Sequence, residues 1–199
     1  MLNYEYKLSE SIYSHISHYR NILSSLSLDR WWCERIYNLN GKTVLITGGS
    51  RGLGLVIAGQ LTQAGAHLVI CARDRIELER GRTELEQRGG EVLAIPCDMT
   101  DKAQVDVMVQ QVRDHFGAID ILFNNAGTDF VGPMEQMTWE YYNDSMKLHF
   151  WAPLYTTYAV LPQMHERHQG RIVNISSIGG KVAFPHMLPY CASKFALTG

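Results

Sequence analysis

The sequence lacks any cysteine pair of the C-x-x-C kind, although the chain of 199 residues holds four cysteines. They stand far apart, at Cys33, Cys71, Cys97 and Cys191. This spacing argues against a structural zinc site and against a disulfide framework. It favours a reducing compartment, so we expect a cytoplasmic protein. Cys71 and Cys97 lie at the ends of apolar runs and are expected in the core.

Charge of one sign and long apolar runs are also scarce. The chain has 18 lysines and arginines against 20 acidic residues, for a net charge of -2. Without a basic excess, nucleic acid is not an expected partner. No apolar run approaches the roughly 18 residues of a membrane span, and the N-terminus lacks the apolar stretch of a secretory signal. With 46% hydrophobic residues, the composition is that of a globular domain with a sizeable core.

Residues 1–40 differ from the remainder and are expected to form a helical N-terminal extension. Apolar side chains from Leu8 to Leu26 recur near a heptad spacing, which predicts one amphipathic helix over about residues 8–28. Such a helix can pack on its own domain or on a sister subunit. Trp31 and Trp32 favour a second alternative, a helix on a membrane surface, but the few basic residues weigh against it. Disorder is the third alternative.

Apolar strand-like runs alternate with helix-like segments over residues 41–199. The alternation predicts an α/β fold, a doubly wound parallel sheet of Rossmann type. Pro162 is expected to kink or shorten the last long helix. A final helix should begin near Tyr190, and the chain stops a few residues into it, so we expect a fold that is truncated before its last strand. The expected strands are 43–47, 67–71, 91–97, 120–124 and 171–176, and the expected helices are 53–64, 75–88, 102–116 and a long segment within 139–168.

A glycine-rich turn follows the first expected strand, in the run TVLITGGSRGLG from Thr43 to Gly54. Gly48, Gly52 and Gly54 connect that strand to a helix-like segment. A strand that turns sharply into a helix leaves backbone N–H groups free at the helix start, where they attract a phosphate. Glycines let a pyrophosphate approach closely. The run therefore predicts a dinucleotide site, with a turn that binds nothing as the alternative.

Tyr190 and Lys194 are four residues apart on an expected helix and therefore share one face. Tyrosine is a poor acid–base catalyst at neutral pH because its pKa is near 10 in peptides. An ammonium about 5 Å away favours the phenolate by roughly 3 kcal/mol at an effective dielectric near 20. The pair is a candidate acid/base for interconverting a hydroxyl and a carbonyl, although an ordinary helix pair has the same spacing. Ser177 follows an expected strand, at the edge of the sheet where doubly wound folds bind ligands.

These motifs, together with Asn124-Asn125-Ala126-Gly127, resemble the short-chain dehydrogenase/reductase family, of the compact type with a TGxxxGxG turn and a YxxxK pair. The resemblance runs from about Gly41 to the end. It implies an oxidoreductase that passes hydride between a nicotinamide cofactor and a carbonyl or secondary alcohol, without a metal. Tyr190 would donate or accept the proton, Lys194 would promote its ionisation and hold the nicotinamide ribose, and Ser177 would orient the substrate oxygen. Cofactor contacts are expected from Gly48, Ser50, Arg51, Gly52, Leu53, Gly54, Arg73, Asp98, Met99, Asn125, Ala126, Gly127, Tyr190 and Lys194.

Two positions keep alternatives open. Asp98 looks like the family's adenine contact, but it could instead cap the helix that starts near Lys102, with Thr100 as a rival for that cap. His149 stands where the family pattern has an asparagine that feeds a proton relay through Lys194. A histidine can still shuttle a proton, so we expect His149 to be catalytic. The alternative is a packing substitution with water carrying the relay.

The end of the second expected strand distinguishes NADP from NAD. An enzyme selecting NAD would have an acid there to bind the ribose 2′-hydroxyl, whereas this chain has Arg73. Arg51 stands in the glycine turn nearby, and two guanidinium groups suit a 2′-phosphate. The sequence therefore predicts NADP(H). Asp74 is the competing signal for NAD, because it lies about 20 residues past the glycines.

Other functions remain open at this stage. Epimerases and dehydratases share the Tyr–Lys pair, but their glycine turn has the spacing TGxxGxxG. A truncated nucleotide-binding protein without turnover is the non-enzymatic alternative. Phe130, Phe184, Pro185 and Met187 hint at a hydrophobic substrate, although packing within loops is the simpler account. The resemblance further implies a homodimer or homotetramer that pairs through the long helix and the Tyr190 helix.

Overall fold

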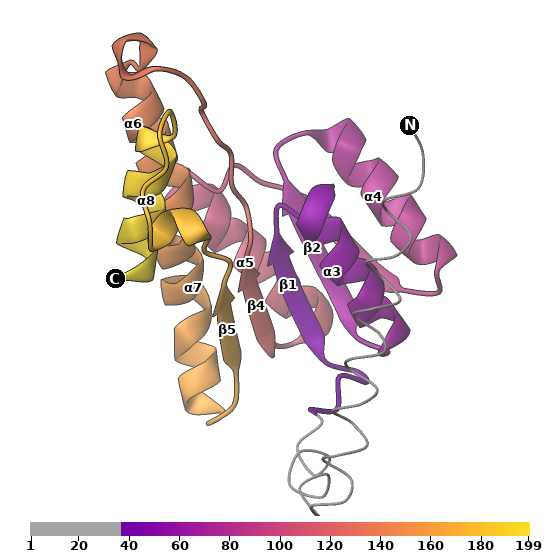
Figure 1. Cartoon of the computed structure of the whole chain (residues 1–199). Helices are drawn as coiled ribbons and strands as arrows, with labels where there is room; N and C mark the ends of the chain where they lie inside the picture. The colour runs from indigo at the N-terminus through magenta and orange to yellow at the C-terminus, as the bar shows by residue number, and fades with distance from the viewer. Residues whose placement is uncertain (1–36) are drawn as a thin grey trace, which may run out of the picture. The chain divides into compact units, whose positions relative to one another are not determined.

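Five parallel strands form one sheet in the computed structural model, which describes residues 37–199 (Figure 1). The strand order is β3-β2-β1-β4-β5, so the chain winds outward from β1 in both directions. This order confirms the expected doubly wound sheet of Rossmann type. The expected helix over residues 8–28 lies outside the described residues. The strands are β1 (Thr43–Thr47), β2 (His67–Ala72), β3 (Glu91–Pro96), β4 (Ile121–Asn124) and β5 (Arg171–Asn174).

The central strand β1 is buried along its whole length. Leu45 pairs in register with Val69 of β2 and with Leu122 of β4, and all three side chains are fully buried. A parallel sheet with helices on both faces buries both sides of its strands, which is why the run from Val44 to Ile46 is apolar without alternation. The core therefore fixes the position of the turn that follows Thr47.

Helices cover both faces of the sheet. In Figure 1, α3 lies in front of the strands and α5 behind them. On the α5 face, the side chains of Val105, Met108 and Val160 join the core cluster with Leu45 and Leu122. The helices are α3 (Gly52–Gln63), α4 (Arg75–Gln87), α5 (Lys102–Phe116), α6 (Trp139–Met146), α7 (Ala152–Glu166) and α8 (Leu188–Thr198), with a π-helical segment η2 (Lys147–Trp151) and two 3-10 turns, η1 (Met134–Gln136) and η3 (Ile178–Gly180).

The long helical segment lies where it was expected but is not shortened at Pro162, and a kink there stays a prediction. Pro162 does not end it, since α7 runs on to Glu166. The proline removes the hydrogen bond to the carbonyl of Tyr158, a residue on the exposed side of α7. The irregular part is η2, a π-helical stretch between α6 and α7 that no pattern in the sequence indicates.

The cap of α5 is a second correction. Asp101 caps this helix, because its side chain accepts hydrogen bonds from the backbone N–H groups of Ala103 and Gln104. Neither Asp98 nor Thr100 takes that role. Instead, Asp98 Oδ1 accepts hydrogen bonds from Thr100 N at 2.9 Å and from Thr100 Oγ1 at 2.8 Å, which closes the loop between β3 and α5.

A charged cluster fastens the amino-terminal edge of the sheet, away from the strand ends that carry the glycine turn. Asp120, just before β4, forms ion pairs with Arg167 and, at 3.8 Å, with Lys42. Its Oδ2 atom also accepts a hydrogen bond from Thr43 N at 3.1 Å. The carboxyl side chain is only 9% exposed, so its partners replace water that burial removes.

Candidate active site

The glycine turn after β1 is shaped by close contacts that exclude side chains. Gly48 has φ +66°, and a Cβ there would lie 2.9 Å from the Cα atom of Ala126. A Cβ on Gly54 would lie 2.4 Å from the carbonyl oxygen of Gly48. The backbone thus folds back on itself at the start of α3, which leaves the N–H end of that helix open to an anion.

The loop after β4 is hydrogen-bonded to this turn. Thr47 Oγ1 accepts hydrogen bonds from Asn125 N and Ala126 N, both at 3.0 Å. In return, the side-chain amide of Asn125 donates to the carbonyl oxygens of Thr47 at 2.9 Å and Gly48 at 3.2 Å. Asn125 therefore acts behind the turn as a brace, and it brings Ala126 and Gly127 beside Gly48.

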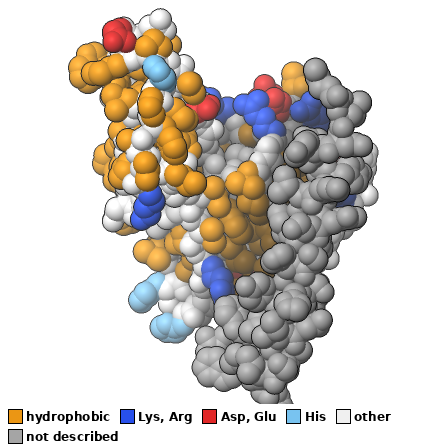
Figure 2. Space-filling view, in the orientation of Figure 1, with side chains coloured by type: hydrophobic (Ala, Val, Ile, Leu, Met, Phe, Trp, Pro, Cys, Tyr) orange, Lys and Arg blue, Asp and Glu red, His pale blue; other side chains and the backbone are white. Residues whose placement is uncertain are grey.

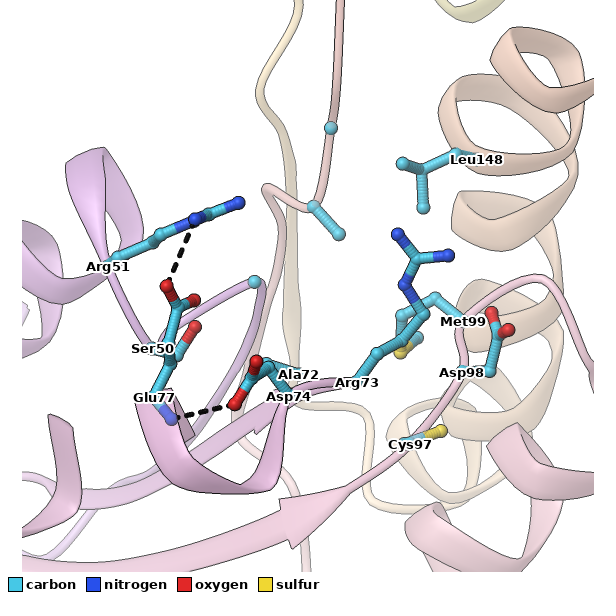
Figure 3. Close-up of a pocket in the computed structure, with 13 residues that line it drawn as sticks. Ser50, Arg51, Ala72, Arg73, Asp74, Glu77, Cys97, Asp98, Met99 and Leu148 are labelled. Carbon is cyan, nitrogen blue, oxygen red and sulfur yellow. Dashed lines mark hydrogen bonds and ion pairs between the residues drawn. The ribbon is translucent and has the colours of Figure 1, made fainter. Parts of the chain in front are cut away.

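A pocket of about 330 Å³ opens at the carboxyl ends of β1, β2, β3 and β4 (Figure 3). This is the edge of a doubly wound sheet where ligands bind. The lining includes eight of the residues that the sequence assigns to the cofactor: Gly48, Ser50, Arg51, Arg73, Asp98, Met99, Ala126 and Gly127. Six assigned residues lie outside the lining: Gly52, Leu53, Gly54 and Asn125, which belong to the turn and its brace, and Tyr190 and Lys194, which lie on α8. Four lining residues were not expected: Ala72, Glu77, Cys97 and Leu148.

Charged side chains dominate one part of this pocket. In Figure 3 the guanidinium groups of Arg51 and Arg73 lie on either side of the cavity. Arg51 pairs with Glu77 at 3.1 Å and its side chain is 74% exposed, so the pair is weak. Asp74 Oδ1 accepts hydrogen bonds from Ile76 N and Glu77 N, both at 2.9 Å, and so caps α4.

Tyr190 and Lys194 share one face of α8, as their spacing requires. The Lys194 ammonium nitrogen lies 5.8 Å from the centroid of the Tyr190 ring. The same nitrogen donates a hydrogen bond to the carbonyl oxygen of Ile175 at 2.9 Å, just past β5. Lys194 is 5% exposed, and this burial lowers its pKa. The hydrogen bond to Ile175 thus fixes the ammonium group of Lys194 near the Tyr190 ring.

Ser177 lies beside Tyr190 because Gly179 has no side chain. A Cβ on Gly179 would lie 2.9 Å from Tyr190 Cε1 and 3.4 Å from Ser177 Oγ, so both atoms border the same small space. Ser177 Oγ accepts a hydrogen bond from Gly179 N at 3.0 Å, which orients its hydroxyl. Ser177, Tyr190 and Lys194, which the sequence assigns to catalysis, therefore lie together at the end of β5.

His149 lies in η2 and is fully buried. Its ring meets the Tyr190 ring edge to face, with centroids 5.4 Å apart. Nε2 accepts a hydrogen bond from Thr128 N at 3.1 Å, and Nδ1 lies 2.7 Å from Ser193 Oγ. Burial, with a smaller contribution from the Lys194 charge, lowers the pKa of His149 to about 4. Thr128 and Ser193 were given no role from the sequence, because nothing in their spacing indicates a shared partner.

Both cysteines that were expected in the core, Cys71 and Cys97, are found there. Cys71 is fully buried and Cys97 is 2% exposed, and burial raises the pKa of the Cys97 thiol to about 11. The described residues contain no group of three or more histidine, cysteine or acidic side chains arranged to hold a metal ion. Within residues 37–199, no helix combines the length and apolar character that crossing a membrane requires.

Comparison with known proteins agrees with this geometry. The profile of the family described as short chain dehydrogenase matches residues 42–199. A fatty acyl-CoA reductase from Acinetobacter baylyi is 37% identical over 163 residues, which cover 80% of this chain and 55% of the relative. The chain spans about half the length of the curated relatives it matches.

Solved structures give the same result. An NAD+-bound xylitol dehydrogenase superposes with a TM-score of 0.78 at 31% identity, over 81% of this chain and 62% of that one. A metagenomic short-chain oxidoreductase in complex with NADP superposes with a TM-score of 0.77 at 33% identity, over 82% of this chain and 74% of that one. The two neighbours carry different nicotinamide cofactors, so likeness alone does not choose between NAD and NADP.

Proposed function

The chain belongs to the short-chain dehydrogenase/reductase family, and from that premise we propose that it is an NADP(H)-dependent oxidoreductase acting on a carbonyl or secondary alcohol. The bound cofactor would supply or accept the hydride. The observation that carries the proposal is the convergence of Ser177, Tyr190 and Lys194 at the end of β5, on the same edge of the sheet as the pocket.

The residues of the chain have separable tasks in this proposal. Tyr190 gives a proton to the substrate oxygen during reduction and takes it back during oxidation. The Lys194 ammonium nitrogen lies 5.8 Å from the centroid of the Tyr190 ring and would hold the nicotinamide ribose. Its bond to the Ile175 carbonyl keeps it from swinging into solvent. Ser177 accepts a hydrogen bond from Gly179 N, which leaves its own hydroxyl hydrogen to donate to the substrate oxygen.

The pocket fits the cofactor by shape and charge. The close contacts at Gly48 and Gly54 make the turn tight, and the N–H groups at the start of α3 would then bind a pyrophosphate. Arg51 and Arg73 supply two cations for a 2′-phosphate. Asp74 uses one carboxyl oxygen to cap α4, which supports reading it as a structural residue rather than as a partner of the ribose.

Turnover is tested by following NADPH oxidation with a panel of ketones and aldehydes. The protein should oxidise NADPH with at least one carbonyl. Tyr190→Phe should lower kcat by a factor of about 10² to 10⁴ while NADPH still binds, because only the acid–base group is lost. NADPH binding without turnover by the unaltered protein would instead support the nucleotide-binding alternative.

Cofactor preference is tested separately, by the dissociation constants of NADPH and NADH. Arg73→Ala should weaken NADPH binding about 10- to 100-fold and leave NADH nearly unchanged, because charged hydrogen bonds contribute about 1.5–3 kcal/mol. Arg82→Ala is the matched control, since Arg82 pairs with Glu79 and Glu86 of its own helix outside the pocket. Equal constants for the two cofactors in the unaltered protein would refute the NADP assignment.

Exposed apolar side chains support an apolar substrate for the proposed reaction. Val131, Met134 and Phe184 are exposed large apolar side chains in two loops joined by a hydrogen bond from Gly132 N to the carbonyl oxygen of His186 at 2.9 Å. Figure 2 shows hydrophobic side chains gathered over α6 and α8. The relative named for fatty acyl-CoA supports the same choice. A higher kcat/KM for long-chain than for sugar-like carbonyls is the expected result.

We further propose a homodimer or homotetramer in the cytoplasm. Trp151, Tyr158 and Phe195, on η2, α7 and α8, are 46%, 68% and 45% exposed and could meet a second copy. Cys71, Cys97 and Cys191 are free thiols, as a reducing compartment would keep them. Light scattering of the purified protein and fractionation of cells test these two proposals.

A further inference from the structure

Three hydrogen bonds link three separate segments through His149. Thr128, in the loop after β4, donates its N–H to His149 Nε2 at 3.1 Å. Nδ1 of the same ring meets Ser193 Oγ at 2.7 Å, and Ser193 Oγ donates to the carbonyl oxygen of Tyr190 at 2.8 Å. The imidazole therefore joins the cofactor-side loop to the first turns of the helix that carries Tyr190 and Lys194.

The donors and acceptors in this series of hydrogen bonds allow one arrangement of protons. A carbonyl oxygen can only accept, so the single hydroxyl hydrogen of Ser193 is used on Tyr190. Ser193 Oγ must then accept from His149, which puts the ring proton on Nδ1. An N–H group points at Nε2, so that nitrogen is unprotonated. His149 is thus neutral and of one tautomer, with both nitrogens engaged.

The surroundings oppose any change of that state. A second ring proton would stand on Nε2, directly against the Thr128 N–H. The charged group acting on the ring is Lys194, whose ammonium disfavours an imidazolium, and the facing titratable group is Tyr190. On the loop side, Gly127 packs so closely that a Cβ there would lie 3.1 Å from Nε2.

We propose that His149 is a positioning residue that fixes the Tyr190 backbone against the Gly127–Thr128 loop, and that it carries no proton in the reaction. This role replaces the proton relay expected from the sequence, and it rests on the proposed function. It also assigns Ser193 and Thr128 as the partners through which His149 acts. Loss of either link should loosen the alignment of phenol and cofactor pocket rather than remove an acid or a base.

The first experiment does not depend on activity. In protein labelled with ¹⁵N at histidine, the His149 signals are identified by their loss in His149→Asn. They should show a neutral ring with hydrogen on Nδ1, unchanged from pH 5.5 to pH 9. A ring protonated on Nε2, or one that titrates near pH 6.5, would overturn the proposal whether or not the protein turns over a substrate.

The second experiment uses kinetics. His149→Asn can still donate to Ser193, and His149→Gln can still accept from Thr128 N, but neither side chain titrates. Both should lower kcat about tenfold or less, with the shape of the pH–rate profile unchanged and KM for NADPH nearly constant. Loss of one limb of the profile in both variants would show that His149 moves a proton.

A double-mutant cycle completes the test. If His149 acts through Ser193, then His149→Gln combined with Ser193→Ala should cost little more in kcat than the larger single effect. Fully additive effects would contradict a shared path. If the unaltered protein shows no turnover with any carbonyl, the proposed function fails, and the tautomer measurement still decides the role of His149.

Discussion

Replacing Gly54 by alanine should destabilise the glycine turn strongly. The added Cβ would lie 2.4 Å from the carbonyl oxygen of Gly48 and 2.6 Å from Nδ2 of Asn125. That amide nitrogen already donates to the carbonyl oxygens of Thr47 and Gly48. The methyl group therefore cannot be accommodated without moving backbone or breaking both of these bonds.

The cost can be worked out from these contacts. Overpacking costs about 1–3 kcal/mol, and two lost hydrogen bonds add about 1 kcal/mol each. Alanine recovers up to about 1 kcal/mol of helix propensity in α3. The net expectation is a loss of about 2–4 kcal/mol in the free energy of unfolding, measured by urea denaturation. NADPH binding should weaken as well, since the Gly48 carbonyl moves with the turn.

Gly52→Ala is the matched control in the same turn. Gly52 has φ +56°, but no atom lies within 4 Å of the position that its Cβ would take. Its cost is therefore the backbone strain alone, about 1–2 kcal/mol. If Gly52→Ala proved the more destabilising of the two, or if Gly54→Ala left urea unfolding unchanged, the argument from close contacts would be wrong.

Three further outcomes are expected. Glu77→Gln should tighten NADPH binding severalfold at low salt, because it releases Arg51 from an ion pair that contributes at most about 1 kcal/mol. A titration of cofactor fluorescence measures this affinity, and an unchanged value would argue against a phosphate at Arg51. Asp120→Asn should lower the free energy of unfolding by about 2–4 kcal/mol while NADPH binding stays constant, because it leaves Arg167 without its buried partner. Folding lowers the pKa of His149 from 6.5 to about 4, so between these pH values the unfolded chain binds more protons than the folded protein. The free energy of unfolding should therefore fall as the pH drops from 6.5 towards 4. His149→Asn should flatten that part of the stability–pH curve, and an unchanged curve would refute this assignment.

Much of the fold could be predicted because local pattern and tertiary role agree. The run from Val44 to Ile46 is apolar throughout since β1 is covered on both faces, and parallel pairing follows from the helix between each pair of strands. The shared face of Tyr190 and Lys194 follows from helical spacing. It does not depend on where the helix begins, which is at Leu188 rather than near Tyr190. These features depend on neighbours in sequence.

The features that could not be predicted depend on distant partners or on near-equal local choices. Glu77 reaches Arg51 across 26 positions, and no spacing rule indicates it. Asp98, Thr100 and Asp101 are all good capping residues within four positions, and only the backbone geometry selects Asp101. His149 was expected to act as a relay group because its residue type can titrate, and its two hydrogen-bond partners, Thr128 and Ser193, lie 21 and 44 positions away, where no spacing rule indicates them.

The π-helical segment Lys147–Trp151 has a consequence for how this part of the chain can change length. A π-turn holds one residue more than an α-turn, which rotates the helix before it by about 100° relative to the helix after it. Removing one residue here would restore a regular helix but turn the α8-contacting side of α6 away from its neighbour. A substitution in this segment therefore keeps the alignment of α6 with α7, while deletion of a single residue would rotate α6 away from α8.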